Sequence, residues 1–436
     1  MAPERSLEEV IQERAFSGLV QAQSQSFFRL ANTLLAQRQE EWNKRHLNQL
    51  VIESQALESF LDDYGAAYNR TWCLLRELAA SLRWFSLAGF SLSHLLGRLE
   101  SYGLDVTFSS SERDEAQRSL QRVRAFLDDN LERLLKRTCA EVERLGLERT
   151  PETYPDESLL GLAPRQRLPR NVGQEDLLDE NQKIAEVASK YLASCDLLED
   201  LGIRRIGEPE RRRELLERIC TEAQARVYEA TVHNLQSSYD TYIKNSVVEG
   251  RDDRLPRLRG HLSTALHLLE SVTFLTHFVE RHEGGIRSQD AEQEIARLID
   301  RRGVQEMILN ELLATADRFM QRGRGIAEEL LHSYTNLQEL TVELPRDIKL
   351  HARPAALIVG IVGHFGTPVE FEVQGHKCNA GSILELLVTV GSHPDARRFV
   401  FRGDENPLRD IGLLFQNGLG EHGLDRLPER LSYLRG

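Results

Sequence analysis

The sequence predicts a multidomain chain of α and α+β class. A large all-helical region covers about residues 1–335, and a small domain with a four-stranded antiparallel sheet and three helices follows it. Apolar residues recur at helical spacing through the first region, with few helix breakers. From about Gln338, short alternating runs typical of strands replace that pattern. With 436 residues and 41% hydrophobic content, the chain can build two or three cores.

Four apolar stripes at helical spacing place helices in the first region. They are Phe16, Val20, Phe27, Ala31 and Leu34; Val123, Leu127, Leu131 and Leu134; Leu262, Leu266, Leu269 and Val272; and Val304, Ile308, Leu312, Phe319 and Ile326. Ser109 and Glu112 match a capping box, which predicts where the helix that carries Val123 begins.

A proline-rich segment near residues 148–178 interrupts the helical pattern. It holds Pro151, Pro155, Pro164 and Pro169, and proline inside a helix removes a backbone hydrogen bond. The segment therefore either separates two helical halves or crosses a single bundle, and the pattern leaves both arrangements open.

The pattern after Gln338 predicts the order β-α-β-β-α-β-α over residues 338–425. The runs "ELTVELP" and "ARRFVFRG" are typical of strands, and "TPVEFEVQGHKCNAG" predicts a hairpin that turns near Gly375 and His376. The runs "ARPAALIVGIVGHFG", "SILELLVTVG" and "ENPLRDIGLLFQN" predict helices, the last with Pro407 in its first turn. Four strands under helices fit an open-faced β-sandwich, and residues 426–436 are assigned to a C-terminal tail.

The charge of the chain argues against nonspecific binding to nucleic acid or to an anionic membrane. Acidic residues number 68 and basic residues 55, which gives a net charge of -13. Arginines gather at Arg204–Arg205 and at Arg211–Arg213, but acidic residues interrupt both groups, which favours a solvated helix face. We expect no nucleic-acid partner and no membrane partner.

The cysteines and the first residues predict a cytoplasmic protein. The five cysteines are far apart and form no CxxC pair, so neither a zinc knuckle nor a disulfide framework is indicated. The charged start "MAPERSLEEVIQER" lacks the apolar run of a signal peptide, and no stretch of about 18 apolar residues occurs.

Common catalytic and metal-binding motifs are absent from the sequence. His261, His267, His277 and His282 lack the i, i+4 spacing with which one helix face binds a metal ion. There is no G-x-x-x-x-G-K-[ST] phosphate loop and no G-x-S-x-G nucleophile elbow. We therefore expect no metal site and no cofactor.

The stretch "KLHARPAA", Lys349 to Ala356, places a histidine at the start of a helix. His351 falls at the N-cap, because Pro354 is tolerated only in the first turn. The amides of Ala352 and Arg353 and the positive helix end favour an anion beside the imidazole, and the guanidinium offers a second anchor. Phosphate suits this arrangement, since imidazole accepts and releases a phosphoryl group near neutral pH.

These residues, in this order of elements, resemble the histidine phosphocarrier protein HPr of the bacterial phosphoenolpyruvate:sugar phosphotransferase system. The family's "LHARPAA" is present unbroken as Leu350 to Ala356. The family's serine at the start of the second helix is matched by Ser382 in "NAGSIL", Asn379 to Leu384. The resemblance covers about residues 338–420 and implies nothing about the helical region.

The resemblance implies roles for three residues. His351 would accept the phosphoryl group, Arg353 would stabilise the phosphate, and Ser382 would be a target for a regulatory kinase. An ordinary N-cap role for Ser382 remains open. The implied partners are an enzyme I-like phosphoryl donor and an acceptor or regulated protein.

The sequence departs from the family beside the histidine. Lys349 stands where the family usually has glycine, and the first helix lacks the lysines that meet an acidic face of enzyme I. Its apolar surface implies a cover, either the chain's own helical region or a dedicated partner. The docking residues expected there, some of which also belong to the small domain's core, are Leu357, Ile361, Ile383, Leu384 and Leu387.

Two functions follow from these patterns. The first is a phosphocarrier or phospho-relay protein with a phosphohistidine intermediate, which is a carrier of phosphoryl groups and no independent catalyst. Its helical region would add a partner site, a regulatory gate or a homo-oligomer contact. The alternative is a regulatory binding module that recruits a protein, either switched by phosphorylation or never phosphorylated.

Overall fold

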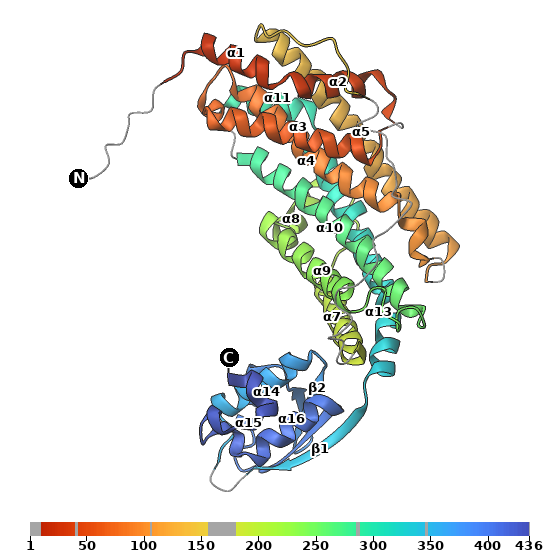
Figure 1. Cartoon of the computed structure of the whole chain (residues 1–436), viewed down its shortest axis with the longest axis vertical. Helices are drawn as coiled ribbons and strands as arrows, with labels where there is room; N and C mark the ends of the chain where they lie inside the picture. Colours follow the sequence, from red (N-terminus) through yellow and green to blue (C-terminus); the bar gives the residue numbers. More distant parts are fainter. Residues whose placement is uncertain are drawn as a thin grey trace, which may run out of the picture. The chain divides into compact units, whose positions relative to one another are not determined.

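The computed structural model describes residues 10–39, 42–104, 107–155, 180–284, 288–344 and 348–435. The chain divides into two compact units. The first takes in the described residues of 1–169, 198–233 and 260–320, and the second takes in those of 170–197, 234–259 and 321–436. Figure 1 shows helices in the chain before β1, and strands together with further helices in the C-terminal part. No helix in the described ranges is long and apolar enough to cross a membrane.

The large N-terminal region is helical, as the apolar stripes predict. Its helices are α1 (Glu13–Gln23), α2 (Gln25–Ala36), α3 (Lys44–Asp63), α4 (Cys73–Leu96), α5 (Ser110–Arg144), α7 (Glu180–Asp200), α8 (Pro209–Ile219), α9 (Glu222–Tyr242), α10 (Arg254–Gly284), α11 (Gln289–Leu298), α12 (Arg301–Glu306) and α13 (Ala314–Tyr334). A π-helical stretch, Met307–Leu313, joins the last two. The predicted start of α5 is confirmed, because Ser109 is its N-cap and forms a capping box with Glu112.

The apolar stripes of these helices lie mostly in the interior. Leu127, Leu131 and Leu134 of α5 are fully buried, as are Leu262 and Leu269 of α10. Burial of each such side chain removes a large apolar area from water and stabilises the fold. Ile326, the last member of the fourth stripe, is only half-buried.

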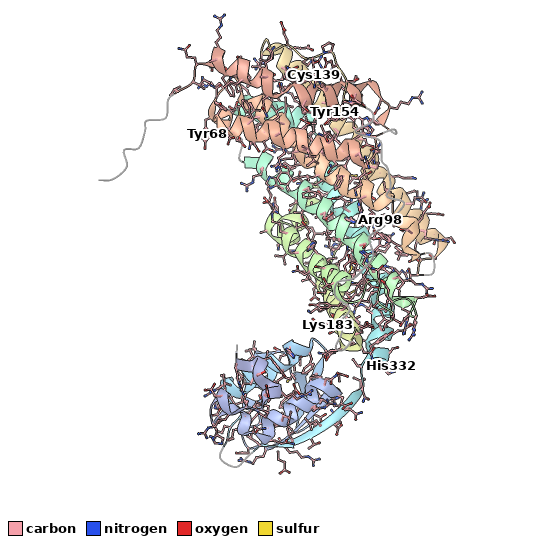
Figure 2. All side chains as sticks on the ribbon, viewed as in Figure 1. Tyr68, Arg98, Cys139, Tyr154, Lys183 and His332 are labelled. Atoms are coloured by element: carbon pink, nitrogen blue, oxygen red, sulfur yellow. The ribbon has the colours of Figure 1, made fainter. Side chains whose placement is uncertain are left out.

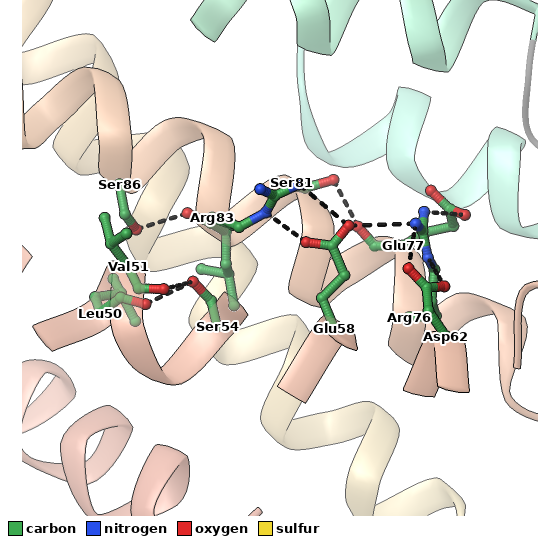
Figure 3. Close-up of polar contacts among 11 residues, drawn as sticks. Leu50, Val51, Ser54, Glu58, Asp62, Arg76, Glu77, Ser81, Arg83 and Ser86 are labelled. Carbon is green, nitrogen blue, oxygen red and sulfur yellow. Dashed lines mark hydrogen bonds and ion pairs between the residues drawn. The ribbon is translucent and has the colours of Figure 1, made fainter. Parts of the chain in front are cut away.

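Helices α3 and α4 pack together around a cluster of charged side chains (Figure 3). Arg76 donates two hydrogen bonds to Asp62, at 2.8 and 2.9 Å, and one each to Glu58 and Glu77. Arg83 forms a second ion pair with Glu58 at 2.5 Å. Glu58 and Glu77 are nearly buried, and burial raises the pKa of Glu77 while Arg76 opposes that shift. Because every buried carboxylate has a guanidinium partner, the cluster joins the two helices without an unpaired charge.

The proline-rich segment is not helical where it is described. Residues 147–155, with Pro151 and Pro155, run beside α2. The side-chain amide of Asn32 donates to the carbonyl of Thr150 at 2.8 Å, and the backbone N–H of Tyr154 donates to the hydroxyl of Thr33 at 2.8 Å. Pro164 and Pro169 lie outside the described residues.

Within the described ranges, α7, α9, α10 and α13 each contribute a part of the second unit that precedes β1. The side-chain amide of Gln321, on α13, donates to the carbonyl of Cys195, on α7, at 2.9 Å. The ammonium group of Lys183, labelled on α7 in Figure 2, lies 4.9 Å from the ring centre of Tyr242 on α9. The hydroxyl of Tyr334 donates to Asp252, just before α10, at 3.0 Å.

The small C-terminal domain has the predicted order of strands and helices. Its elements are β1 (Leu337–Glu343), α14 (Ala352–Phe365), β2 (Val369–Val373), β3 (His376–Asn379), α15 (Ile383–Gly391), β4 (Arg398–Asp404) and α16 (Glu405–Gln416). The strands form one antiparallel sheet in the order β1-β4-β2-β3. The hairpin turns at Gln374 and Gly375, one residue earlier than predicted, because both have positive φ and His376 already pairs with Val373.

Strand alternation gives the sheet one apolar and one charged face. Phe371, Phe399 and Phe401 are fully buried in the core cluster that includes Ile358 of α14 and Ile411 of α16. On the other face, the Arg402 guanidinium pairs with Glu339 at 2.8 Å, with Glu370 at 3.2 Å and with Glu372. The apolar face thus lies against α14, which begins with the histidine motif, and against α16.

The residues assigned to a C-terminal tail belong to the core of this domain. Leu427 and Leu431 are buried in the core cluster. The hydroxyl of Tyr433 donates to Asp410 at 2.8 Å, and Arg430 forms an ion pair with the same carboxylate at 2.5 Å. The core therefore continues past residue 425, because these side chains close the end of α16.

Candidate functional site

His351 caps the N-terminus of α14. Its backbone is extended, with φ -111° and ψ -169°, and its carbonyl accepts the first helical hydrogen bond from the N–H of Ala355 at 3.0 Å. Its Nδ1 atom accepts a long hydrogen bond, 3.4 Å, from the N–H of Arg353. The predicted N-cap position is confirmed, and Pro354 stands in the first turn, where a missing N–H costs no helical hydrogen bond.

The site is open to a partner protein. The His351 side chain is 53% exposed, and Ala352 and Arg353 are also exposed. The amides of the first helical turn have no acceptor within the helix, and the helix dipole adds positive potential there. A phosphoryl group on the imidazole would therefore meet backbone donors and, within reach, a guanidinium that can make two hydrogen bonds.

A carboxylate occupies the other side of the imidazole. The Nε2 atom of His351 lies 3.2 Å from Oε1 of Glu421, and that buried oxygen accepts no hydrogen bond of good geometry from any described residue, His351 included. Because Nδ1 accepts from the Arg353 amide, its lone pair lies on the side of the helix end. Nδ1 thus faces the first turn of α14, and Glu421 lies against the Nε2 side of the ring.

A tight turn after α16, residues 417–423 ("NGLGEHG"), brings Glu421 to this position. Gly418, Leu419 and Gly420 all have positive φ, at 67°, 55° and 73°, and Leu419 is fully buried as the anchor of the turn. A Cβ atom on Gly420 would lie 2.7 Å from Cδ1 of Leu357, and the φ of 73° is one that glycine adopts without strain, so glycine favours this close approach to α14.

Sequence reasoning did not identify Glu421 as a site residue. The two glycines that flank Leu419 signal a turn of positive φ after the last helix. That signal places no side chain against His351, because the contact depends on how α16 and α14 pack in three dimensions.

Ser382 caps the second helix of the domain. Its hydroxyl accepts a hydrogen bond from the N–H of Glu385 at 3.4 Å, and the side chain is half-buried. Glu385 turns back to accept from the N–H of Asn379 at 3.0 Å. The structure therefore gives Ser382 a capping contact, and a phosphate there would meet both the helix dipole and a nearby carboxylate.

The expected docking residues fall into two groups. Ile361 is fully buried, and Leu357 and Leu387 are partly buried against the same core cluster. Ile383 and Leu384 are 40% and 70% exposed, and Val388, one turn further along α15, is 60% exposed. We call Ile383, Leu384 and Val388 the α15 patch. Ile361 has no exposed surface with which to contact a partner.

The helix histidines of the N-terminal region form no metal cluster where their side chains are described. His267 contacts Glu270 at 2.9 Å, and His277 contacts Glu222 at 2.8 Å. His261 is buried, with its ring 5.9 Å from that of Phe108. The side chain of His282 lies outside the described part of the chain.

Comparison with known protein families identifies the C-terminal domain. The family described as "PTS HPr component phosphorylation site" matches residues 338–396, which include His351, Arg353 and Ser382. The chain therefore carries an HPr-like domain at its C-terminal end. The N-terminal region matches no family, and Glu421 lies beyond the matched residues. Neither the curated proteins nor the solved structures contain a match.

Proposed function

We propose that this protein is a phosphocarrier, in which His351 accepts a phosphoryl group from an enzyme I-like donor protein and passes it to an acceptor protein. One observation carries the proposal: an exposed imidazole stands at the N-terminus of α14, next to Arg353, within the HPr-like domain. The domain would act as an open-faced sandwich that presents this helix end to its partners. The cytoplasm, where such donors work, is the compartment that fits this role.

The geometry supports a transfer through Nδ1. The lone pair of Nδ1 attacks phosphorus, the N–P bond forms, and the bond from phosphorus to the donor breaks, with its electron pair returning to the donor. The phosphorylated ring keeps its proton on Nε2 and carries a positive charge, which the Glu421 carboxylate stabilises. The Arg353 amide leaves its long contact with Nδ1 and, with the guanidinium, holds the phosphoryl oxygens.

The α15 patch is the surface on which we place the donor and acceptor proteins. Helices α14 and α15 lie side by side, so a protein seated on Ile383, Leu384 and Val388 would reach toward the histidine. Apolar side chains this exposed are frequent at protein contacts. Phosphorylation of Ser382, next to the patch, would add negative charge there and weaken docking of an acidic or apolar partner.

The test is a transfer assay on the full-length chain with phosphoenolpyruvate and enzyme I. Label should appear on His351, as read by mass spectrometry under alkaline conditions that preserve phosphohistidine. His351→Ala should abolish the label, and Arg353→Ala should slow labelling roughly tenfold because the phosphoryl oxygens lose a charged donor. His376→Ala, at an exposed histidine on β3, is the matched control and should label normally.

The alternative function is a regulatory binding module. The α15 patch favours it, because exposed apolar side chains are frequent at protein contacts and need no phosphoryl group to bind a partner. In that case the chain would stay unlabelled while ordinary HPr is labelled in the same tube. Its partner would then bind wild type and His351→Ala equally well, and the helical region would supply a regulatory contact with the domain or with a second copy of the chain.

A further inference from the structure

A hollow in the first unit is lined by arginines that the histidine site does not use. Its charged lining consists of Arg204, Arg205, Arg211, Arg218, Glu208 and Glu214, and its volume is about 490 Å³. Arg204 and Arg205 lie on the loop between α7 and α8. Arg211 and Arg218 lie on one face of α8, since residues seven apart in a helix share a face. We call this feature the arginine hollow.

The loop that forms one wall of the hollow is held by Asn310. The N–H of Ile206 donates to the side-chain oxygen of Asn310 at 2.9 Å, and the side-chain amide donates back to the carbonyl of Ile206 at 3.0 Å. Asn310 is only 8% exposed and belongs to the π-helical stretch between α12 and α13. Such stretches are frequent at functional sites. The wall is therefore fixed by a buried side chain.

A buried arginine also holds this loop. Arg212 is only 2% exposed, and its guanidinium donates to the carbonyls of Ile206 and Arg302, both at 3.1 Å. The expectation of a solvated helix face is wrong for this residue, because those carbonyls and the Glu306 carboxylate, 3.5 Å away, replace water around its charge. Its neighbours on α8 keep their positions relative to the loop, which preorganises the hollow for a ligand.

The ion pairs of the lining arginines leave positive charge unused. Arg205 pairs with Glu115 at 2.8 Å, and Arg211 pairs with Glu208 at 3.2 Å. Within the ranges that the structure describes, no carboxylate lies at ion-pair distance from Arg204 or Arg218. The four lining arginines outnumber the two lining glutamates, Glu208 and Glu214, so in a chain of net charge -13 this hollow keeps a local excess of positive charge, which favours an anionic ligand.

We propose that the arginine hollow binds a small molecule that carries at least two phosphate groups. Arginine recognises phosphate through paired hydrogen bonds in a planar fork. Arg204 on the loop and Arg218 in the last turn of α8 each take one phosphate, and the volume is large enough for a molecule bigger than orthophosphate. This site is separate from His351 and does not depend on the phosphocarrier proposal.

The test is calorimetric titration of the full-length chain with sodium pyrophosphate, ATP and sodium orthophosphate, with sodium sulfate at matched ionic strength as the salt control. We expect pyrophosphate and ATP to bind, and orthophosphate to bind about tenfold more weakly or more, since it engages one guanidinium. Arg204→Ala with Arg218→Ala should weaken pyrophosphate binding by about tenfold or more. Arg213→Ala, on α8 but outside the hollow, should bind as wild type does.

Three results would overturn the proposal. They are no heat from pyrophosphate or ATP, equal affinity for sulfate and pyrophosphate, and undiminished binding in the double variant. Arg204 and Arg218 are exposed, so their loss should leave the fold intact, which circular dichroism checks. If the double variant misfolds, Arg218→Lys serves instead: it keeps the charge but loses the planar fork, and it should still weaken pyrophosphate binding.

Discussion

The imidazole of His351 and the carboxylate of Glu421 face each other, with Nε2 and Oε1 3.2 Å apart. One residue begins the first helix of the HPr-like domain, and the other lies on a turn after its last helix. The pair therefore connects the imidazole at the start of α14 to a segment outside the part that matches the HPr family.

Glu421→Gln should lower the extent of His351 phosphorylation. The amide keeps the size of the side chain but removes the negative charge that stabilises the phosphorylated, cationic ring. Because the imidazole is half-exposed and water screens the pair, we expect a roughly three- to tenfold shift in the transfer equilibrium. Titration against a phosphorylated donor measures it. Asp425→Asn, at an exposed acid nearby, is the matched control, and equal equilibria for both variants would exclude this role for Glu421.

Val388→Asp should weaken docking of the donor at the α15 patch. The side chain is 60% exposed, so a charge there leaves the core intact while it opposes an apolar contact. In the transfer assay, in which the donor is the enzyme and this chain its substrate, we expect the donor's KM for the chain to rise roughly tenfold with little change in kcat. Val227→Asp, at a valine 57% exposed on α9, controls for an added surface charge. A similar KM in both variants would place the docking surface elsewhere.

Ser382→Ala should loosen the start of α15, whereas Ser382→Asp should not. Alanine removes the cap contact with the Glu385 amide, which is worth about 1 kcal/mol, and aspartate can replace it. Hydrogen exchange of the α15 amides in the full-length chain measures the local effect. A kinase site with no capping role would give unchanged exchange in both variants.

His261→Phe should make the stability of the chain less sensitive to acid. Burial lowers the pKa of His261 to about 4. The unfolded chain, in which histidine titrates near 6.5, therefore binds the proton first, and stability is lost as the pH falls from about 6.5 to about 4. At about pH 5 this protonation lowers the free energy of unfolding by about 2 kcal/mol, and phenylalanine should remove that loss. At neutral pH the substitution should change the free energy of unfolding little.

Thermal unfolding of wild type and His261→Phe at the two pH values measures this difference. His364→Phe, at an exposed histidine of α14, is the control, and its stability relative to wild type should not increase as the pH falls. Parallel pH profiles for wild type and His261→Phe would show that His261 does not limit stability in acid.

Local sequence patterns predicted much of this protein because they report short-range physics. The N-cap at His351 follows from Pro354 at the third position of the helix, and the start of α5 follows from Ser109 and Glu112, since neighbours within one turn satisfy the same amides. The order of strands and helices in the small domain follows from the same kind of periodicity.

Other features depend on contacts between residues far apart in the chain, which no short pattern reports. Ile361 is fully buried and Ile383 is 40% exposed, although both are apolar residues on helices. The burial of Leu431 in the core of the small domain and the hydrogen bonds of Asn310 to the loop before α8 likewise arise only from packing.

The sequence by itself determined that His351 stands at a helix end suited to a phosphoryl group, because capping depends on residues within one turn. Only the tertiary structure decided that Glu421 faces that ring and that Arg204 and Arg218 share a hollow. Charges attract across space without any fixed spacing along the chain, so only the packing of distant elements determines which of them meet.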